Sequence, residues 1–123
     1  MNQQTLSLFE DRAAIVKALA HPTRLFIVDE LAKGERCVCD LREEIGADMS
    51  TVSRHLSVLK KAGIVGDTKR GLQVFYRLRV PCILNFFTCI EAVLRENAQR
   101  HQWHMGETDT VSTVSCSAKN CTS

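Results

Sequence analysis

The sequence contains no apolar run close to the roughly 20 residues that are needed to cross a bilayer. Its N-terminus, MNQQTLSLFEDR, also lacks the basic segment and apolar core of a secretory signal peptide. We therefore expect a protein of the reducing cytoplasm that has no membrane partner. At 123 residues, with 45% apolar and 24% charged residues, the chain has the length and composition of one globular domain.

The six cysteines lack the Cys-x-x-Cys spacing of a thiol oxidoreductase, and no βαβ pattern or nucleophile–base pair accompanies them. An enzyme is therefore disfavoured, although the paired cysteines keep an oxidoreductase among the alternatives. In a reducing compartment, six cysteines are expected to be free thiols, metal ligands or redox sensors rather than structural disulfides.

Acidic residues are nearly absent from one block of the chain. Residues 49–80 hold seven Lys/Arg and a single acid, Asp67, whereas the segments before and after this block carry net charges of −3 and −1. A local basic block is typical of an element that binds a polyanion. A solvated basic face that contacts nothing is the alternative, so charge alone does not decide between them.

The first part of the chain has the periodicity of helices. Thr5–Ala20 spaces its apolar residues as an amphipathic helix does. In the following segment, HPTRLFIVDELAKG, Pro22 suits the first turn of a second helix and Gly34 suits its end.

Two further helices follow. CVCDLREEIG predicts a short third helix that stops at Gly46. DMSTVSRHLSVLKKAG predicts a fourth, which Asp48 or Ser50 can cap and Gly63 can end.

The period then changes to that of strands. IVGDTKRGLQVFYRLRV alternates and is rich in β-branched and aromatic residues, with a turn predicted at Lys69–Gly71. Pro81 opens a last helix, whose apolar stripe includes Phe86, Val93 and Leu94. The order of elements predicts an α+β, mainly α, winged helix-turn-helix fold with an added C-terminal helix. We place the domain at residues 1–104 and a flexible, cysteine-containing tail at residues 105–123.

The fourth helix, Met49–Ala62, has two distinct sides on a helical wheel. The side predicted to face the core carries Met49, Val52, Leu56 and Leu59. The opposite side carries Ser50, Arg54, Ser57 and Lys61, with Thr51, Ser53 and Val58 on its flanks. Short hydroxyls let a helix enter the major groove, and an arginine can bind a guanine edge with two hydrogen bonds. A solvated face would instead pair its lysines with glutamates, and no glutamate occurs between Met49 and Gly66.

The hairpin adds cations that can reach phosphates beside the groove, whereas Phe75 and Tyr76 are expected to pack it onto the domain. His55 points toward the apolar side of the fourth helix and is expected to be a hydrogen-bonded support residue. The predicted DNA-contacting set comprises Ser50, Thr51, Ser53, Arg54, Ser57, Lys60, Lys61, Lys69, Arg70 and Arg77.

The combination of KALAHPTRLFIV, CVCDL, STVSRHLSVLKKAGIV and RGLQVFYRL resembles the ArsR/SmtB family of metalloregulatory repressors over about residues 5–95. The resemblance implies a homodimer, joined through its first and last helices, that binds double-stranded operator DNA and releases it on binding a toxic metal or metalloid. DNA binding itself needs no cofactor. The apolar stripe of the last helix, which a monomer cannot fully bury, is consistent with such an interface.

The family's arsenic sensors read Cys-Val-Cys-Asp-Leu-Cys where this chain reads Cys37-Val38-Cys39-Asp40-Leu41-Arg42. By that resemblance, Cys37 and Cys39 are ligands of As(III) or Sb(III), and Arg42 replaces the third thiol. In a regular helix, residues two apart point about 200° from each other, so joint binding requires an unwound helix start. The alternative is that both cysteines are small residues at a helix start.

A trigonal As(III) site needs a third sulfur. Cys116 and Cys121 in the tail are the candidates, because Cys82 and Cys89 in the last helix suit core packing better. A Cd(II) or Pb(II) sensor and a thiol redox switch remain alternatives on the same fold. A zinc sensor is disfavoured, because no Asp-x-His precedes His101 and His104 at the spacing that the family uses.

Overall fold

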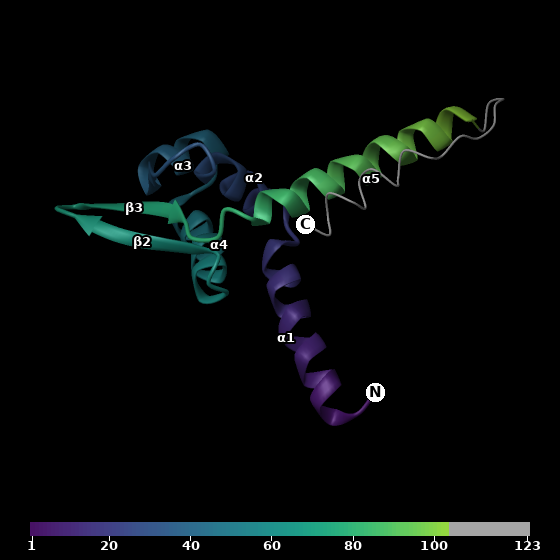
Figure 1. Cartoon of the computed structure of the whole chain (residues 1–123). Coiled ribbons are helices and arrows are strands. Elements are labelled where there is room, and N and C mark those ends of the chain that lie inside the picture. Colours follow the sequence, from purple (N-terminus) through teal and green to yellow (C-terminus); the bar gives the residue numbers. More distant parts are fainter. Residues whose placement is uncertain (104–123) are drawn as a thin grey trace. The chain divides into compact units, whose positions relative to one another are not determined.

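The computed structural model describes residues 1–103 of the chain, which form two compact units, one ending at Pro81 and one beginning at Cys82 (Figure 1). Each unit is described by itself. The first unit contains α1 (Gln3–Leu19), α2 (Pro22–Leu31), β1 (Arg36–Cys37), α3 (Val38–Ile45), α4 (Met49–Lys61), β2 (Val65–Arg70) and β3 (Gln73–Leu78). The second contains α5 (Ile83–Trp103). The winged helix-turn-helix prediction is confirmed.

Side chains that precede each helix set where the helix starts. Asn2 caps α1 by accepting a hydrogen bond from the Thr5 amide, and Asp48 caps α4 by accepting one from the Thr51 amide. These bonds satisfy amides that have no partner inside a helix. At the other end of α4, Gly63 takes a positive φ of 85°, which favours glycine.

Helices α3 and α4 form the helix-turn-helix, and β2 and β3 form the wing. The three strands make an antiparallel sheet in the order β1-β3-β2. Gly71, with a φ of 66°, forms the wing's turn together with Leu72, close to the position predicted for it.

The core of the first unit lies where α2, α3, α4 and the sheet meet. Its buried apolar residues are Ala18, Leu19, Ile27, Val28, Leu31, Cys37, Leu41, Val52, Leu56, Leu59, Ile64 and Val65. Only the end of α1 contributes to this core. The N-terminal part of α1 extends away from the rest of its unit, as Figure 1 shows.

Both long helices expose apolar side chains. On α1 these are Leu8, Phe9, Ile15 and Val16, and on α5 they are Phe86, Val93 and Leu94. Each of these side chains is at least 40% exposed in the single chain. Within the described residues, no helix combines the length and the apolar character needed to span a bilayer.

The structure corrects several predicted boundaries. The second helix ends at Leu31 rather than Gly34, and the last begins at Ile83 rather than Pro81. Cys82 therefore lies before the last helix and is exposed, so the prediction that it packs into a core is wrong. Met49, at the first position of α4, is 37% exposed rather than buried. The predicted tail, residues 105–123, lies outside the described residues.

The short strand β1 is absent from the sequence prediction. Its two residues pair with β3, Arg36 opposite Tyr76 and Cys37 opposite Phe75. A strand of two residues leaves no alternating pattern to detect, because its pairing depends on a partner 38 residues further along the chain.

Candidate DNA-binding face and thiol site

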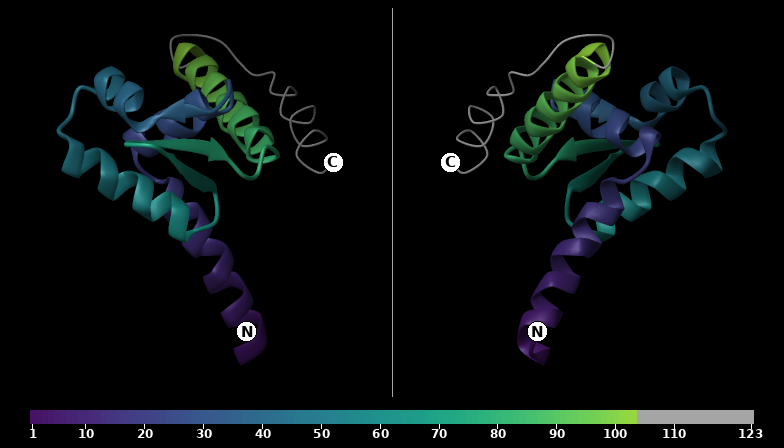
Figure 2. Two further views of the ribbon diagram at one scale, coloured as in Figure 1. Left: turned by 90° about the vertical axis from the view of Figure 1, so that its left-hand side faces the viewer. Right: turned by 90° about the vertical axis from the view of Figure 1, so that its right-hand side faces the viewer.

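The long exposed side of α4 carries the groups that the sequence predicted. Val52, Leu56 and Leu59 are fully buried. The opposite side exposes Ser50, Ser53, Arg54, Ser57 and Lys61, and the flanking Thr51 is half-buried. In Figure 2, one flank of α4 has no other element of its unit beside it. The helix thus presents hydroxyls and cations along one uncovered face, which is the chemistry needed to bind phosphates and base edges.

The predicted DNA-contacting cations differ in their surroundings. Arg54, Lys61 and Lys69 form no ion pair among the described residues. Lys60, in contrast, lies 3.1 Å from Asp67, the single acid of the basic block. Arg77 donates to Thr68 Oγ1 across the wing at 3.2 Å. The predicted phosphate contact of Lys60 would therefore compete with an internal carboxylate.

Arg70 is held at the base of the wing's turn by two contacts. Its guanidinium donates to both carboxylate oxygens of Glu35 at 2.8 and 3.1 Å. It also lies over the ring of Phe75, 4.8 Å from the centroid. A bidentate pair with stacking fixes the direction of the guanidinium. Glu35 thereby joins the wing to the segment that leads into β1, which the sequence did not predict.

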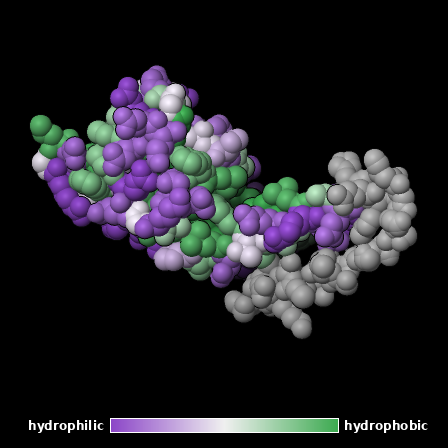
Figure 3. Space-filling model, turned by 90° about the horizontal axis from the view of Figure 1, so that it is seen from above, coloured by the Kyte–Doolittle hydropathy of each residue, from purple (hydrophilic) through white to green (hydrophobic). Residues whose placement is uncertain are grey.

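The tip of the wing is apolar. Leu72 is 99% exposed there, and Figure 3 shows a hydrophobic spot at the far end of the wing, next to hydrophilic surface. Sequence reasoning did not select this residue, because it assigned function to the cations of the hairpin only.

His55 is the support residue that the sequence predicted. It is 9% exposed, its Nδ1 accepts a hydrogen bond from Arg24 Nε at 3.2 Å, and its ring centroid lies 4.3 Å from that of His21. Burial, with the charges of His21 and Arg24, lowers the pKa of His55. The neutral ring is therefore the form that the fold favours. Arg24 is a contributor that the sequence prediction missed.

The two thiols lie at the start of α3, but only one is inside the helix. Cys37 is the N-cap, with the extended backbone angles φ −72° and ψ 145°, and its Sγ accepts a hydrogen bond from the Cys39 amide at 3.4 Å. Cys39 is in the first turn and exposed, whereas Cys37 is buried. The angle of about 200° that keeps two such side chains from binding one ion holds only when both residues are inside a helix. It does not apply here, because α3 begins one residue later than predicted.

The Cys37 thiol changes the acidity of the Cys39 thiol. The hydrogen bond with Cys37 and then its charge raise the pKa of Cys39, while the nearby Arg42 guanidinium acts in the opposite direction. Two thiolates this close repel each other, so a bound cation or electrophile that bonds to both sulfurs would relieve the repulsion. The pair thus has the donor chemistry of a site for a soft centre.

The thiol site is built into the body of the domain. Cys37 pairs with Phe75 of the wing through the sheet. Its neighbour Arg36 donates to Glu30 at 2.8 Å and to Glu44 at 2.7 Å, which ties β1 to both α2 and α3. Helix α3 in turn contacts α4 and β3. Any displacement at the two thiols therefore bears on both the wing and α4.

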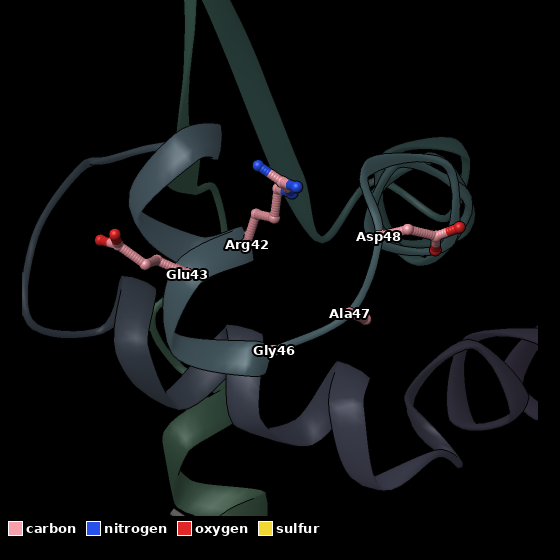
Figure 4. Close-up of a pocket in the computed structure, with 5 residues that line it drawn as sticks. All are labelled: Arg42, Glu43, Gly46, Ala47 and Asp48. Carbon is pink, nitrogen blue, oxygen red and sulfur yellow. The ribbon is translucent and has the colours of Figure 1, made fainter.

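Arg42, at the position of the family's third thiol, lines a shallow hollow between α3 and α4. The hollow has a volume of about 430 Å³, and its other lining residues are Glu43, Gly46, Ala47 and Asp48. In Figure 4, Arg42 projects into the space between the two helices, while Glu43 and Asp48 point away from it. A guanidinium is not a ligand for a soft metal, so the described part of the site offers two sulfurs.

A third ligand is not supplied by the part of the chain that the structure describes. Among residues 1–103, no three His, Cys, Asp or Glu side chains form a group that could hold a metal ion. Cys82 is an exposed free thiol, whereas Cys89 on α5 is half-buried and disulfide-bonded, so the expectation that the cysteines carry no disulfide is wrong for Cys89. The two predicted candidates, Cys116 and Cys121, lie outside the described residues.

Comparison with known proteins agrees with this arrangement. Residues 21–66 match the family described as "Bacterial regulatory protein, arsR family". An uncharacterized HTH-type transcriptional regulator from Methanocaldococcus jannaschii is 46% identical over 69 residues, which cover 55% of this chain and 78% of that protein. The arsenical resistance operon repressor of Escherichia coli is 45% identical over 65 residues, which cover 52% of this chain and 56% of the repressor.

Solved structures share the fold. The homodimeric winged helix-turn-helix DNA-binding domain of a possible ArsR-family transcriptional regulator from Mycobacterium bovis superimposes with a TM-score of 0.67 at 31% identity. That match covers 78% of this chain and 89% of the M. bovis domain.

Proposed function

The chain belongs to the ArsR family of bacterial regulatory proteins, and from this premise we propose that it is a transcriptional repressor that releases its operator DNA when its thiols bind As(III) or Sb(III). The observation that carries the proposal is the cysteine pair at the start of α3. Cys37 lies outside the helix with its sulfur on the Cys39 amide, and α3 contacts the recognition helix α4.

DNA binding is assigned to α4 and the wing. Arg54 is the residue for a guanine edge, since it lies on the exposed face without an ion pair in the described structure. Lys61 and Lys69 suit phosphates. Lys60 and Arg70 contribute after exchanging Asp67 and Glu35 for phosphate oxygens. Seven cations in residues 49–80 supply the counterion release that drives association.

The repressor is proposed to act as a homodimer. Exposed apolar side chains on α1 and α5 support a self-complementary interface, because a single chain leaves them in water. The similar M. bovis domain is homodimeric. A dimer would place two copies of α4 in successive turns of the major groove, which matches a two-fold symmetric operator.

Release follows from what two sulfur bonds do to the start of α3. When one soft centre bonds both sulfurs, both side chains must turn toward it, which strains the hydrogen bond from the Cys39 amide to Cys37 Sγ that caps α3. Losing a cap costs about 1 kcal/mol of helix stability. Cys37 also pairs with Phe75 in the sheet. Distortion at this point therefore reaches α4 through α3 and the wing through β3.

The inducer is assigned to As(III) or Sb(III) because thiolates bind soft centres strongly and the similar E. coli protein is an arsenical resistance operon repressor. Cys37 and Cys39 supply two sulfurs, and Cys116 or Cys121 is the proposed source of a third. Cd(II), Pb(II) and an oxidant that joins the two thiols are the competing inducers for the same site.

Alkylation mapping tests the assignment. The reduced protein is treated with each inducer in turn, then with iodoacetamide, and the modified cysteines are mapped by mass spectrometry. We expect As(III) to protect Cys37 and Cys39 and to leave the exposed Cys82 reactive, so that Cys82 serves as the internal control. Protection of Cys116 or Cys121 would identify the third sulfur. Full alkylation of Cys37 and Cys39 in saturating As(III) would contradict the proposal.

A further inference from the structure

Arg24 joins three elements of the first unit through hydrogen bonds. In the first turn of α2, its Nε donates to His55 Nδ1 on α4 at 3.2 Å. One terminal nitrogen also faces the carbonyl oxygens of Lys17 and Ala18, at 3.4 and 3.3 Å, at the end of α1. Both carbonyls lie in the last turn of α1, where helical acceptors outnumber amide donors, and the Lys17 carbonyl also accepts from the Ala20 amide at 3.1 Å. A cation at this position is also favoured by the helix dipole.

His55 is the hydrogen-bond acceptor on α4 in this junction. Its Nδ1 accepts from Arg24, so this nitrogen carries no proton and the ring is neutral. The ring also packs at 4.3 Å from His21, whose own Nδ1 accepts from the Thr23 amide and caps α2. With 9% of its surface exposed, His55 faces the interior. It therefore does not contact DNA, although its neighbour Arg54 lies on the DNA-binding face.

The junction adds directional bonds to the apolar packing of α4. Val52, Leu56 and Leu59 hold α4 by apolar contacts, which resist separation but permit small slides and rotations. A hydrogen bond is directional, and leaving the partly buried acceptor on His55 without its donor would be destabilising. The Arg24–His55 bond thus selects one rotation of α4 relative to α1 and α2.

We propose that Arg24 and His55 form a positioning pair that sets the angle of the recognition helix α4 against α1, so that operator specificity depends on two residues that do not touch DNA. The inference rests on the proposed function in DNA binding. If α1 lies in the dimer interface, the same pair also links the interface to α4, and hence to the spacing of the two operator half-sites.

The test compares substitutions that retain the positive charge of Arg24 or the hydrogen-bond acceptor of His55 with one that removes the acceptor. Arg24→Lys keeps the cation but lacks the planar fork that serves His55 and the α1 carbonyls together. His55→Leu removes the acceptor, whereas His55→Gln offers an amide oxygen in its place. Arg12→Lys is the matched control, because Arg12 lies on α1 over the Phe9 ring and outside the junction. For each variant, the affinity is measured for three DNAs. These are the operator, operators with half-sites moved by one base pair, and scrambled DNA.

We expect Arg24→Lys and His55→Leu each to lower operator affinity by about tenfold, the equivalent of one well-aligned base contact. Affinity for scrambled DNA and its dependence on salt should stay at the wild-type values, because the phosphate-binding cations are unchanged. His55→Gln should recover much of the loss. The double variant Arg24→Lys, His55→Leu should lose no more than either single variant, since the pair acts as one unit.

Two results would overturn the inference. One is wild-type operator affinity and half-site preference in Arg24→Lys and His55→Leu variants whose thermal stability is lowered, which would make the pair structural only. The other is an equal loss on operator and scrambled DNA in folded variants, which would place Arg24 in contact with phosphates. Failure of the wild-type protein to prefer its operator over scrambled DNA would instead reject the proposed function.

Discussion

At the scale of the single residue, Arg54 is the side chain that we propose distinguishes specific from general DNA binding. It lies on the exposed face of α4 beside the buried His55. Arg54→Ala should remove operator preference, with a loss of about 1–3 kcal/mol of discrimination for a bidentate guanine contact. Arg54→Lys keeps the charge without the fork, so it should lose preference and keep binding to scrambled DNA. Fluorescence anisotropy with both DNAs measures this, with circular dichroism as the check of folding. Wild-type operator preference in either variant would reject the assignment.

The lowered pKa of His55 predicts that the free energy of unfolding depends on pH. Burial lowers its folded-state pKa below the usual value of 6.5, so the unfolded chain binds a proton at a pH where the folded one does not. Its contribution to stability is therefore present above about pH 6.5 and is lost as the pH falls from there through the lower folded-state pKa.

Urea unfolding at a series of pH values measures this dependence. The free energy of unfolding of the wild-type protein should fall on acidification between about pH 7 and 5, where histidine titrates. His55→Gln should show a smaller fall over the same range. An identical pH profile in the two proteins would contradict the assignment of this stability to His55.

The sequence correctly predicted which side chains are buried or exposed where the period of a single helix determines this. The 3.6-residue period of α4 placed Arg54 outside and Leu56 inside without any knowledge of the fold. The partners of the cations did not follow, because Glu35 reaches Arg70 across 35 positions of chain and only the folded sheet brings the two together. Arg24 was missed for the same reason, since its acceptor on α4 is 31 positions away.

At the scale of the element, the wing is restrained by Glu35. This carboxylate neutralises Arg70 and is exposed, so the pair contributes little to stability. Glu35→Gln should free Arg70 for a phosphate, raise affinity for DNA several-fold at low salt, and steepen the salt dependence by about one counterion.

Titration of DNA at several salt concentrations measures both quantities. Glu10→Gln removes the same charge from α1, away from the wing, and serves as the matched control. Weaker DNA binding in Glu35→Gln than in Glu10→Gln would contradict this account, because it would mean that the Glu35–Arg70 pair holds the wing in its docking position.

The start of α3 shows what element prediction from sequence misses. CVCDLREEIG was correctly assigned to a helix that Gly46 ends, since Gly46 is the left-handed C-cap with φ 77°. The first residue of the helix was placed one position too early, because pairing of Cys37 with Phe75 extends its backbone. With Cys37 outside the helix, the proposed binding of one centre by both thiols does not require the helix to unwind first.

At the scale of the whole molecule, the thiol pair lies next to the basic block, because Cys37 pairs with Phe75 of the wing in the sheet. The winged helix-turn-helix fold and the exposed face of α4 were predictable from periodicity and charge, and the family from its motifs. Periodicity and charge did not predict how many copies of the chain assemble. The apolar side chains of α1 and α5 are exposed in the single chain, and we propose that a second copy of the chain covers them, a proposal that the homodimeric M. bovis relative supports.

Release of operator DNA by As(III) tests the central claim most directly. The reduced wild-type protein and the variants Cys37→Ser, Cys39→Ser and Cys82→Ser are each bound to a fluorescent operator and titrated with As(III). We expect all four to bind the operator, because neither thiol of the pair lies on the DNA-binding face. The wild type and Cys82→Ser should release DNA at the same As(III) concentration. Cys37→Ser and Cys39→Ser should retain it, since serine forms no comparable bond to a soft centre. Release from a Cys37→Ser, Cys39→Ser double variant at the wild-type concentration would contradict the account.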